Sequence, residues 1–180
     1  MIAIIFDTET TGLLLPSKAP LRKQPFIIEI GAIAVDENGE ERMVMSQLLE
    51  PPLILDPKIT KITGIQQRDL EGQPTFADFL PQLREFFNAA DILICHNAPF
   101  DVGMLKNELA RVGCEDFPWP QQTLCTVQEY THLFGRRPKL TELHERVLGR
   151  PLAQTHRALD DVRALRDILV GDGFFKGLKI

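Results

Sequence analysis

The sequence has few cysteines, one tryptophan, one tyrosine and no long apolar run. The three cysteines, Cys95, Cys114 and Cys125, are odd in number and form no C-x-x-C pair, which argues against a disulfide framework or a structural zinc site. Buried, reduced thiols in a cytoplasmic protein are the better prediction. The N-terminus has no basic leader, long apolar stretch or small-residue cleavage site, so we expect neither a signal peptide nor a membrane span.

An excess of basic residues is also missing. Lys and Arg number 20 against 25 Asp and Glu, a formal charge of −5, which argues against a protein that coats nucleic acid by counterion release alone. With 180 residues, of which 44% are hydrophobic, the chain has the size and apolar content of one domain that folds on its own. No repeat or low-complexity linker marks a boundary, so residues 1–180 are predicted to form a single domain.

Hydrophobic periodicity alternates between strand-like and helix-like segments. A turn at residues 36–40 joins two strand candidates into an antiparallel hairpin, and helices and strands then alternate. This order predicts an α/β protein with a mixed sheet flanked by helices. The predicted strands are 2–6, 26–35, 43–49, 91–95 and 123–125, and the predicted helices are 75–88, 99–112, 127–134, 139–148 and 158–169.

Residues 13–25, named here the basic loop, contain three prolines and no acid. Lys18, Arg22 and Lys23 make this stretch basic. A solvated surface loop is the simplest interpretation. Because the stretch follows an acidic segment directly, it is also a candidate for contact with an anionic substrate.

Three carboxylates stand where chemistry is plausible. Asp7 and Glu9 lie two apart at the carboxyl end of the first predicted strand, so both side chains point to one face. Like charges at the end of an apolar strand repel, and a divalent cation between them would explain the arrangement. An acidic turn or helix cap is the alternative. Asp101 falls in the first turn of a predicted helix, where the positive end of the helix dipole favours a carboxylate. Ordinary capping is a strong alternative for Asp101, and only other acids brought to the same site would favour a catalytic role.

The segment before and within helix 158–169 offers a further acid and a histidine. Asp161 lies at the edge of the predicted buried stripe, whereas Asp160 shares the opposite, solvated face. His156 is five residues before Asp161, so on a continuous helix the two would point apart. If both serve one site, His156 must lie on the loop before the helix.

Together these residues form three motifs that resemble a known family. Phe-Asp-Thr-Glu-Thr-Thr-Gly-Leu at 6–13, His-Asn-Ala-Pro-Phe-Asp at 96–101 and His-Arg-Ala-Leu-Asp-Asp at 156–161 resemble the exonuclease motifs of the DEDDh branch of the DnaQ-like superfamily. That superfamily includes the proofreading epsilon subunit of bacterial DNA polymerase III. A histidine five residues before the last aspartate, rather than a tyrosine, resembles the pattern of the histidine branch of that superfamily. The resemblance implies an RNase H-like fold with a five-stranded mixed sheet and 3′-to-5′ hydrolysis of nucleic acid.

The resemblance also implies two divalent ions, Mg²⁺ or Mn²⁺. Asp7, Glu9 and Asp161 would hold one ion, Asp7 would bridge to the second, and Asp101 would act partly through bound water. His156 would be the general base, because imidazole ordinarily titrates near neutral pH.

Substrate contacts follow from the same resemblance. Glu9 would contact the 3′-hydroxyl, and the segment just after it would bind substrate through its backbone. Residues 61–65 resemble a family loop near the terminal nucleotide, in which many proofreading members have histidine where this sequence has Thr63. A second acid-free basic segment, 130–141, could form part of the rim of a substrate cleft or be a solvated loop. The substrate-binding residues expected in this way are Glu9, Thr10, Thr11, Gly12, Leu13, Thr63, Asn97, Phe100, which would stack a base or pack in the core, and His156.

Three functions remain open at this point. A 3′-to-5′ exonuclease acting on single-stranded or frayed DNA ends, in proofreading or repair, is the first, and an RNA-trimming exoribonuclease is its rival. An inactive nucleic-acid-binding module is the third, and the complete set of four acids and His156 argues against it. The sequence ends soon after the last predicted helix, without the extension that tethers epsilon subunits, so we expect either stand-alone action or a polymerase subunit as partner. Setting aside the four site acids leaves 20 basic against 21 acidic residues, which predicts a weak, transient binder of strand ends.

Overall fold

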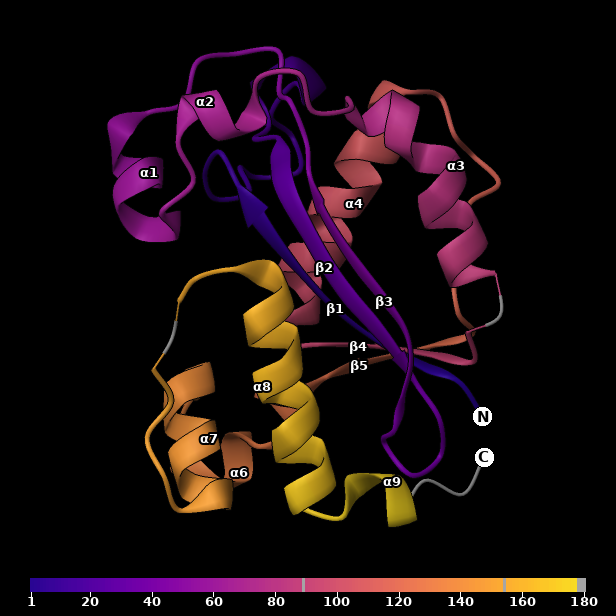
Figure 1. Cartoon of the computed structure of the whole chain (residues 1–180), viewed down its shortest axis with the longest axis vertical. Helices are drawn as coiled ribbons and strands as arrows, with labels where there is room; N and C mark the ends of the chain where they lie inside the picture. Colours follow the sequence, from indigo (N-terminus) through magenta and orange to yellow (C-terminus); the bar gives the residue numbers. More distant parts are fainter. Residues whose placement is uncertain (89, 154, 178–180) are drawn as a thin grey trace.

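A mixed sheet forms the centre of the computed structural model, which describes residues 1–88, 90–153 and 155–177 (Figure 1). The five-stranded sheet has the order β3-β2-β1-β4-β5. Strands β1, β2 and β3 pair antiparallel, and β4 and β5 run parallel to β1. The predicted mixed sheet is therefore confirmed. The strand bounds are Ala3–Thr10 for β1, Ile27–Val35 for β2, Glu41–Leu48 for β3, Ile92–Cys95 for β4 and Gln122–Cys125 for β5.

Strand β1 is longer than its apolar run predicts. It continues through Asp7 and Glu9 to Thr10, so the two acids lie within the strand rather than in a turn after it. The extension forms because β2 runs opposite its whole length, with Asp7 facing Gly31 and Glu9 facing Glu29 in the antiparallel register. Backbone pairing with β2 thus overrides the low strand preference of acidic residues.

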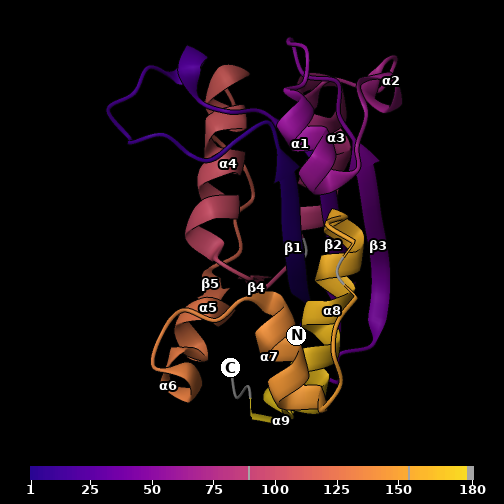
Figure 2. The ribbon, with the colours of Figure 1, turned by 90° about the vertical axis from the view of Figure 1, so that its left-hand side faces the viewer.

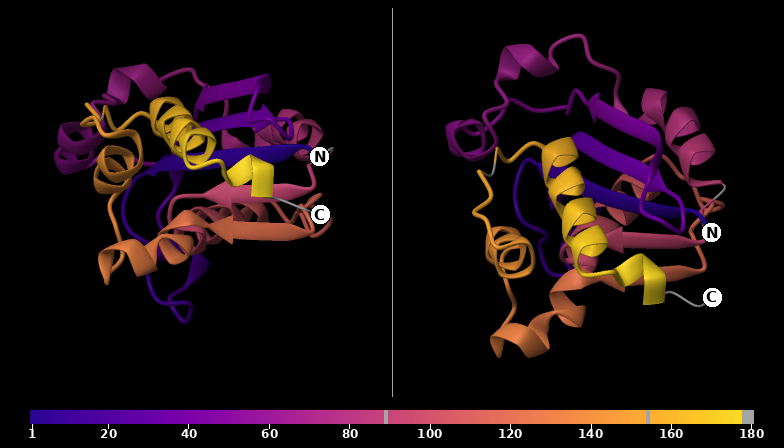
Figure 3. Two further views of the ribbon diagram at one scale, coloured as in Figure 1. Left: turned by 90° about the horizontal axis from the view of Figure 1, so that it is seen from below. Right: turned by 60° about the horizontal axis from the view of Figure 1, so that its bottom comes forward.

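Helices cover both faces of the sheet, and Figure 3 shows α8 crossing one of them. Ile4 and Phe6 of β1 pack with α3 and α4 in one apolar cluster, whereas Ala3 and Ile5 pack with α7 and α8 in another. The alternation along β1 therefore sends Asp7 and Glu9 to the α8 face. The helices described are α1 Pro57–Thr63, α2 Gln67–Leu70, α3 Phe76–Phe87, α4 Ala98–Arg111, α5 Thr126–Glu129, α6 Thr131–Phe134, α7 Leu140–Leu148, α8 Ala158–Gly171 and α9 Phe174–Gly177, with a 3₁₀ turn at Leu21–Lys23.

Two of the predicted segments differ in the structure. Residues 61–65 are not a loop, because Lys61 to Thr63 form the last turn of α1, which ends at Gly64 with φ of 74°. The predicted helix 127–134 is divided into α5 and α6 at Tyr130, whose hydroxyl donates a 2.8 Å hydrogen bond to Asp172. Both differences come from short helices whose ends are set by local hydrogen bonds rather than by an apolar stripe.

The cysteines are all free thiols in the structure. Cys95 and Cys125 are buried as predicted, but Cys114 is only partly buried. Its sulfur accepts a 3.2 Å hydrogen bond from the Arg84 guanidinium at the molecular surface, which corrects the expectation of three buried thiols. Among the described helices, none has the length and apolar character needed to cross a membrane.

Candidate active site

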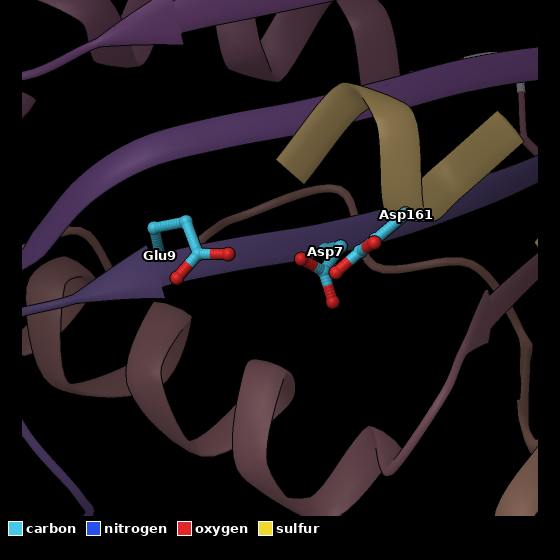
Figure 4. Close-up of side chains that lie close together, drawn as sticks. All are labelled: Asp7, Glu9 and Asp161. Carbon is cyan, nitrogen blue, oxygen red and sulfur yellow. The ribbon is translucent and has the colours of Figure 1, made fainter. Parts of the chain in front are cut away.

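Three of the predicted metal-ligating residues meet at one point, and they are named here the acid cluster. Carboxylate oxygens of Asp7, Glu9 and Asp161 lie within 4.8 Å of one another. Asp7 and Glu9 come from β1 and Asp161 from the first turn of α8, as Figure 4 shows. The strand period of two and the helical stripe are the local reasons that all three side chains point to the same place.

The electrostatics of the acid cluster are unfavourable without a cation. Burial raises the pKa of Asp7 well above its ordinary value, and the charges of Asp101 and Asp161 raise it further. Burial also raises the pKa of Glu9 to about 8, with Asp161 and Glu29 adding to the effect. Oxygen donors at this spacing, held together against their own repulsion, are the donor set that Mg²⁺ or Mn²⁺ requires, so the residues fit a divalent ion.

Asp101 lies in the first turn of α4, as predicted, but outside the acid cluster. It is buried, and its Oδ1 accepts hydrogen bonds from the backbone N–H of Thr8 at 3.1 Å and the Thr8 hydroxyl at 2.8 Å. Burial raises the pKa of Asp101 to about 7, and the two hydrogen bonds from Thr8 act in the opposite direction. Through these hydrogen bonds Asp101 connects α4 to β1 at the residue after Asp7.

A cleft of about 620 Å³, named here the active-site cleft, opens beside the acid cluster. Its lining includes Asp7, Asn97, Arg137, Lys139, His156 and Asp161. His156 lies exposed on the loop before α8, where the predicted shared site requires it. His156 and Asn97 have φ of 52° and 81° and are the non-glycine residues with positive φ in the described chain. Because such backbone is strained in residues with a Cβ and clusters at functional sites, this cleft is the strongest candidate site of the molecule.

The residues after Glu9 lie beside the cluster but are partly occupied by internal contacts. The Thr10 hydroxyl donates a 2.7 Å hydrogen bond to the Gly12 carbonyl, and Thr11 and Phe26 exchange two hydrogen bonds. Leu13, by contrast, is 81% exposed. An exposed leucine next to a site leaves an apolar side chain free for contact with a ligand.

Thr63 and Phe100 are turned toward the protein. The buried Thr63 hydroxyl donates to the Ile59 carbonyl at 3.0 Å and accepts from the Ile65 N–H at 3.1 Å, so it is used within α1. Phe100 is partly buried against the α3–α4 core, as the core-packing alternative predicts. The Asn97 side chain lies in the cleft, where its Oδ1 accepts a 2.5 Å hydrogen bond from Arg137.

Glu29 is a residue that sequence reasoning missed. It is 1% exposed on β2, and both of its carboxylate oxygens bind the Arg157 guanidinium at 2.6–3.1 Å. It also accepts a 3.1 Å hydrogen bond from the N–H of Ala158, the first residue of α8. The sequence does contain one indication of this role, since Glu29 is the one charged residue inside the apolar predicted strand 26–35. A charge buried in such a strand needs a partner of opposite charge.

Gly31 lets α8 approach the sheet. A Cβ at this position would lie 2.3 Å from the carbonyl carbon of Ala158 and 2.4 Å from the N of Leu159. Backbone atoms at that distance cannot yield without moving the helix, so only glycine permits this contact. Gly31 faces Asp7 across the ladder, and the contact therefore brings the start of α8 over the acid cluster.

The fold and the acid cluster define a nuclease of the RNase H-like class, and comparisons with known proteins agree. The family described as "Exonuclease" matches residues 4–169. DNA polymerase III subunit epsilon of Treponema pallidum is 31% identical over 166 residues, covering 91% of this chain and 72% of that protein. The nuclease domain of 3′hExo, a DEDDh family member solved with rAMP, superposes with a TM-score of 0.78 at 19% identity, covering 98% of this chain and 92% of that one.

The chain belongs to the exonuclease family, and it shares its fold with the solved nuclease domain of a DEDDh family member. This confirms the predicted family, the RNase H-like fold and the 3′–5′ exonuclease class. A further relative, the PolC-type DNA polymerase III of Clostridium perfringens, is 35% identical over 92% of this chain, which spans 11% of that protein. The chain likewise spans 25% of a putative bifunctional exonuclease/endonuclease of Mycobacterium tuberculosis.

We predict that the metal-free protein loses stability as the pH rises from about 4, where free carboxyl groups ionise, to about 7 for Asp101 and about 8 for Glu9, their folded-state pKa values. Both values are raised above those of the free side chains, so the stabilising contribution is present at low pH and disappears as the folded groups ionise. The loss should be on the order of 2 kcal/mol, measured by urea unfolding in EDTA. Mn²⁺ should abolish the fall, and a flat profile in EDTA would contradict the prediction.

We also predict that Glu29→Gln lowers kcat about 10- to 100-fold, because α8 and the adjacent His156 lose their fixed position. Stability should fall by about 1–3 kcal/mol. Asp116→Asn is the matched control, since it removes one charge from the exposed Arg84–Asp116 pair and should cost less than about 1 kcal/mol. Steady-state kinetics and thermal unfolding of both variants make the comparison, and equal kcat values would disprove a positioning role for Glu29.

Proposed function

We propose that this protein removes nucleoside 5′-monophosphates from the 3′ ends of single-stranded or frayed DNA. The observation that carries the proposal is the acid cluster of Asp7, Glu9 and Asp161, two of whose members, Asp7 and Asp161, line a cleft together with Arg137 and Lys139. Carboxylates that fit divalent ions, next to cations that suit phosphates, match phosphodiester hydrolysis. The likeness to epsilon subunits of DNA polymerase III supports DNA as the polymer.

In this proposal Asp7, Glu9 and Asp161 would hold one divalent ion, Asp7 would also be a ligand of a second, and Asp101 would contribute through bound water. Bound Mg²⁺ or Mn²⁺ would supply Lewis-acid stabilisation of the negative charge that develops on the phosphate. His156, exposed at the cleft, accepts the proton of the attacking water. Its place on a loop lets the imidazole approach the water without disturbing α8.

Other residues near the acid cluster position the 3′ end of the nucleic-acid substrate. Glu9 contacts the 3′-hydroxyl, the backbone of Thr10 to Gly12 lies alongside it, and the exposed Leu13 packs on a base. Asn97 orients Arg137 toward the phosphates through their hydrogen bond. Phe100 and Thr63 have structural roles and do not contact the substrate. The Phe100 ring packs on the core, and the Thr63 hydroxyl donates a hydrogen bond to a backbone carbonyl of α1.

Trimming of RNA is the second candidate. The structural neighbours that support it are the 3′hExo nuclease domain solved with rAMP and a 3′-exonuclease that recognises a histone mRNA stem-loop, with TM-scores of 0.78 and 0.73. Exonuclease X, solved with a 5′ overhanging duplex DNA, has a TM-score of 0.65 and 24% identity and supports the DNA reading.

A DNA polymerase is the proposed protein partner, with stand-alone repair as the alternative. Epsilon and PolC-type relatives support a polymerase, and the likeness to Exonuclease X supports independent action. We place the protein in the cytoplasm on its free thiols and on its bacterial replication relatives. Co-purification of the tagged protein with polymerase subunits from its own cells distinguishes the two arrangements.

The decisive experiment is digestion of a 5′-labelled DNA 20-mer in Mg²⁺ and in Mn²⁺. We expect a ladder that shortens from the 3′ end, and Asp7→Ala and Asp161→Ala should lower kcat about 1,000-fold or more because each removes a metal ligand. Full-length DNA that survives intact in both ions would refute the proposal. An RNA 20-mer of the same sequence is the parallel arm, and faster loss of RNA would favour the second candidate.

His156→Ala should lower kcat about 100- to 10,000-fold while Mn²⁺ affinity stays unchanged, since the side chain moves a proton and holds no ion. Calorimetric titration of Mn²⁺ and single-turnover hydrolysis measure the two effects separately. His132→Ala is the matched control, because His132 is exposed on α6 and outside the cleft lining. Unchanged kcat in His156→Ala would remove the residue from the proposed mechanism.

A further inference from the structure

The basic loop, residues 13–25, carries cations that have no partner. Lys18, Arg22 and Lys23 are exposed, and their side chains make no ion pair or hydrogen bond with any other residue that the structure describes. Several other surface arginines are paired with acids, as in the pairs Arg84–Asp116, Arg136–Glu142 and Arg166–Glu41. Three neighbouring cations without an acid attract an anion from outside the protein.

The backbone of the basic loop is held in one conformation. The buried Gln24 side chain accepts from the N–H of Leu15 at 3.0 Å and donates to the Leu15 carbonyl at 3.2 Å. Arg111 of α4 donates from Nη2 to the carbonyls of Leu21, Gln24 and Pro25, at 2.7–3.2 Å. Its guanidinium also lies 3.8 Å from the centre of the Phe26 ring. These contacts fasten the far side of the loop to α4.

The near side of the basic loop is anchored by packing and by its closure. Leu14 packs against Gly103 of α4, where a Cβ would lie 2.7 Å from Leu14 Cδ1, so a larger residue would displace it. The Thr11 N–H donates to the Phe26 carbonyl at 2.9 Å and brings the two ends of the loop together. A loop ordered before binding does not lose backbone entropy when a ligand arrives.

The basic loop starts next to the acid cluster. Only Thr10 separates Glu9 from Thr11, where the loop closes, so the base of the loop is within about 7 Å of Glu9 along the backbone. Figure 2 shows the loop projecting beside α4, away from α7. Arg137 and Lys139 lie in the active-site cleft, between α6 and α7. Basic side chains therefore lie both in the active-site cleft and on the basic loop outside it.

We propose that the basic loop binds phosphates of the substrate strand on the 5′ side of the scissile bond, outside the active-site cleft. Phosphates repeat along a strand, so a fixed row of cations binds them without regard to sequence. This inference rests on the proposed function, because it needs a strand whose 3′ end is seated at the acid cluster. It gives the enzyme a preference for strands long enough to reach Lys18, Arg22 and Lys23.

The test compares two triple variants of equal charge change. The loop variant is Lys18→Ala with Arg22→Ala and Lys23→Ala, and the control is Arg146→Ala with Arg150→Ala and Lys176→Ala. The control residues are exposed, and their side chains pair with no other residue that the structure describes. They lie on α7, on the turn after it and on α9, at the other end of the molecule (Figure 2). A third variant, Lys18→Arg with Arg22→Lys and Lys23→Arg, preserves the charge of the loop.

Two measurements distinguish an effect on strand binding by the basic loop from an effect on the active site. Fluorescence anisotropy of a DNA 20-mer in EDTA measures binding without hydrolysis, and steady-state kinetics compare the 20-mer with a dinucleotide in Mn²⁺. We expect the loop variant to raise Kd and KM for the 20-mer about tenfold and to reduce the slope of log Kd against log salt by about 2. Dinucleotide kcat/KM should be unchanged, and the control and charge-preserving variants should behave as wild type.

Three other outcomes overturn the inference, and a fourth overturns only the proposed function. An equal effect of the control variant would show that net charge alone matters, and a fall in dinucleotide kcat/KM would show that the loop shapes the site instead of holding the strand. Weakened binding of duplex DNA with unchanged binding of the single strand would assign the loop to the complementary strand. If no polymer were hydrolysed but the loop variant still lost 20-mer binding, the proposed function would fail while the binding surface remained.

Discussion

Helix α8 rests on β2 at Gly31, where there is no room for a Cβ, and the remainder of the site depends on this contact. It carries Asp161 to the face of β1 on which Asp7 and Glu9 lie. Glu29 fixes the orientation of α8 at this contact, because its carboxylate binds both the Arg157 guanidinium and the first N–H of α8. A van der Waals contact and the ion pair of the buried Glu29 with Arg157 thus determine the distance between Asp161 and the acids of β1, which their repulsion would otherwise increase.

The apo site is therefore held against its own electrostatics. Burial and mutual repulsion raise the pKa values of Asp7 and Glu9, and the apolar layers on both sides of the sheet supply the free energy that keeps the acids together. A divalent ion bound by these carboxylates would offset their mutual repulsion. Binding of such an ion would then stabilise the folded state.

Much of the fold and site could be predicted from the sequence because the relevant patterns are local. Side chains alternate between the two faces along β1, which places Asp7 and Glu9 on the same face. The spacing of apolar residues along α8 places Asp161 at the edge of the buried side and Asp160 on the solvated side. Long-range contacts leave weaker signals. Glu29 became understandable only when Arg157, far away in the sequence, proved to be its partner. The conformation of Thr63 depends on α1, a short helix stabilised by its own caps, which apolar periodicity does not detect.

Asn97 and His156 each adopt a left-handed backbone conformation close to the start of a helix, Asn97 directly before α4 and His156 two residues before α8. Glycine would adopt these angles without strain, but it would leave the cleft without an amide or an imidazole. The conformational cost at each position is about 1–3 kcal/mol. Selection for stability alone would drive both positions toward glycine, so a population kept stable but relieved of the need to degrade strand ends should lose these two side chains early.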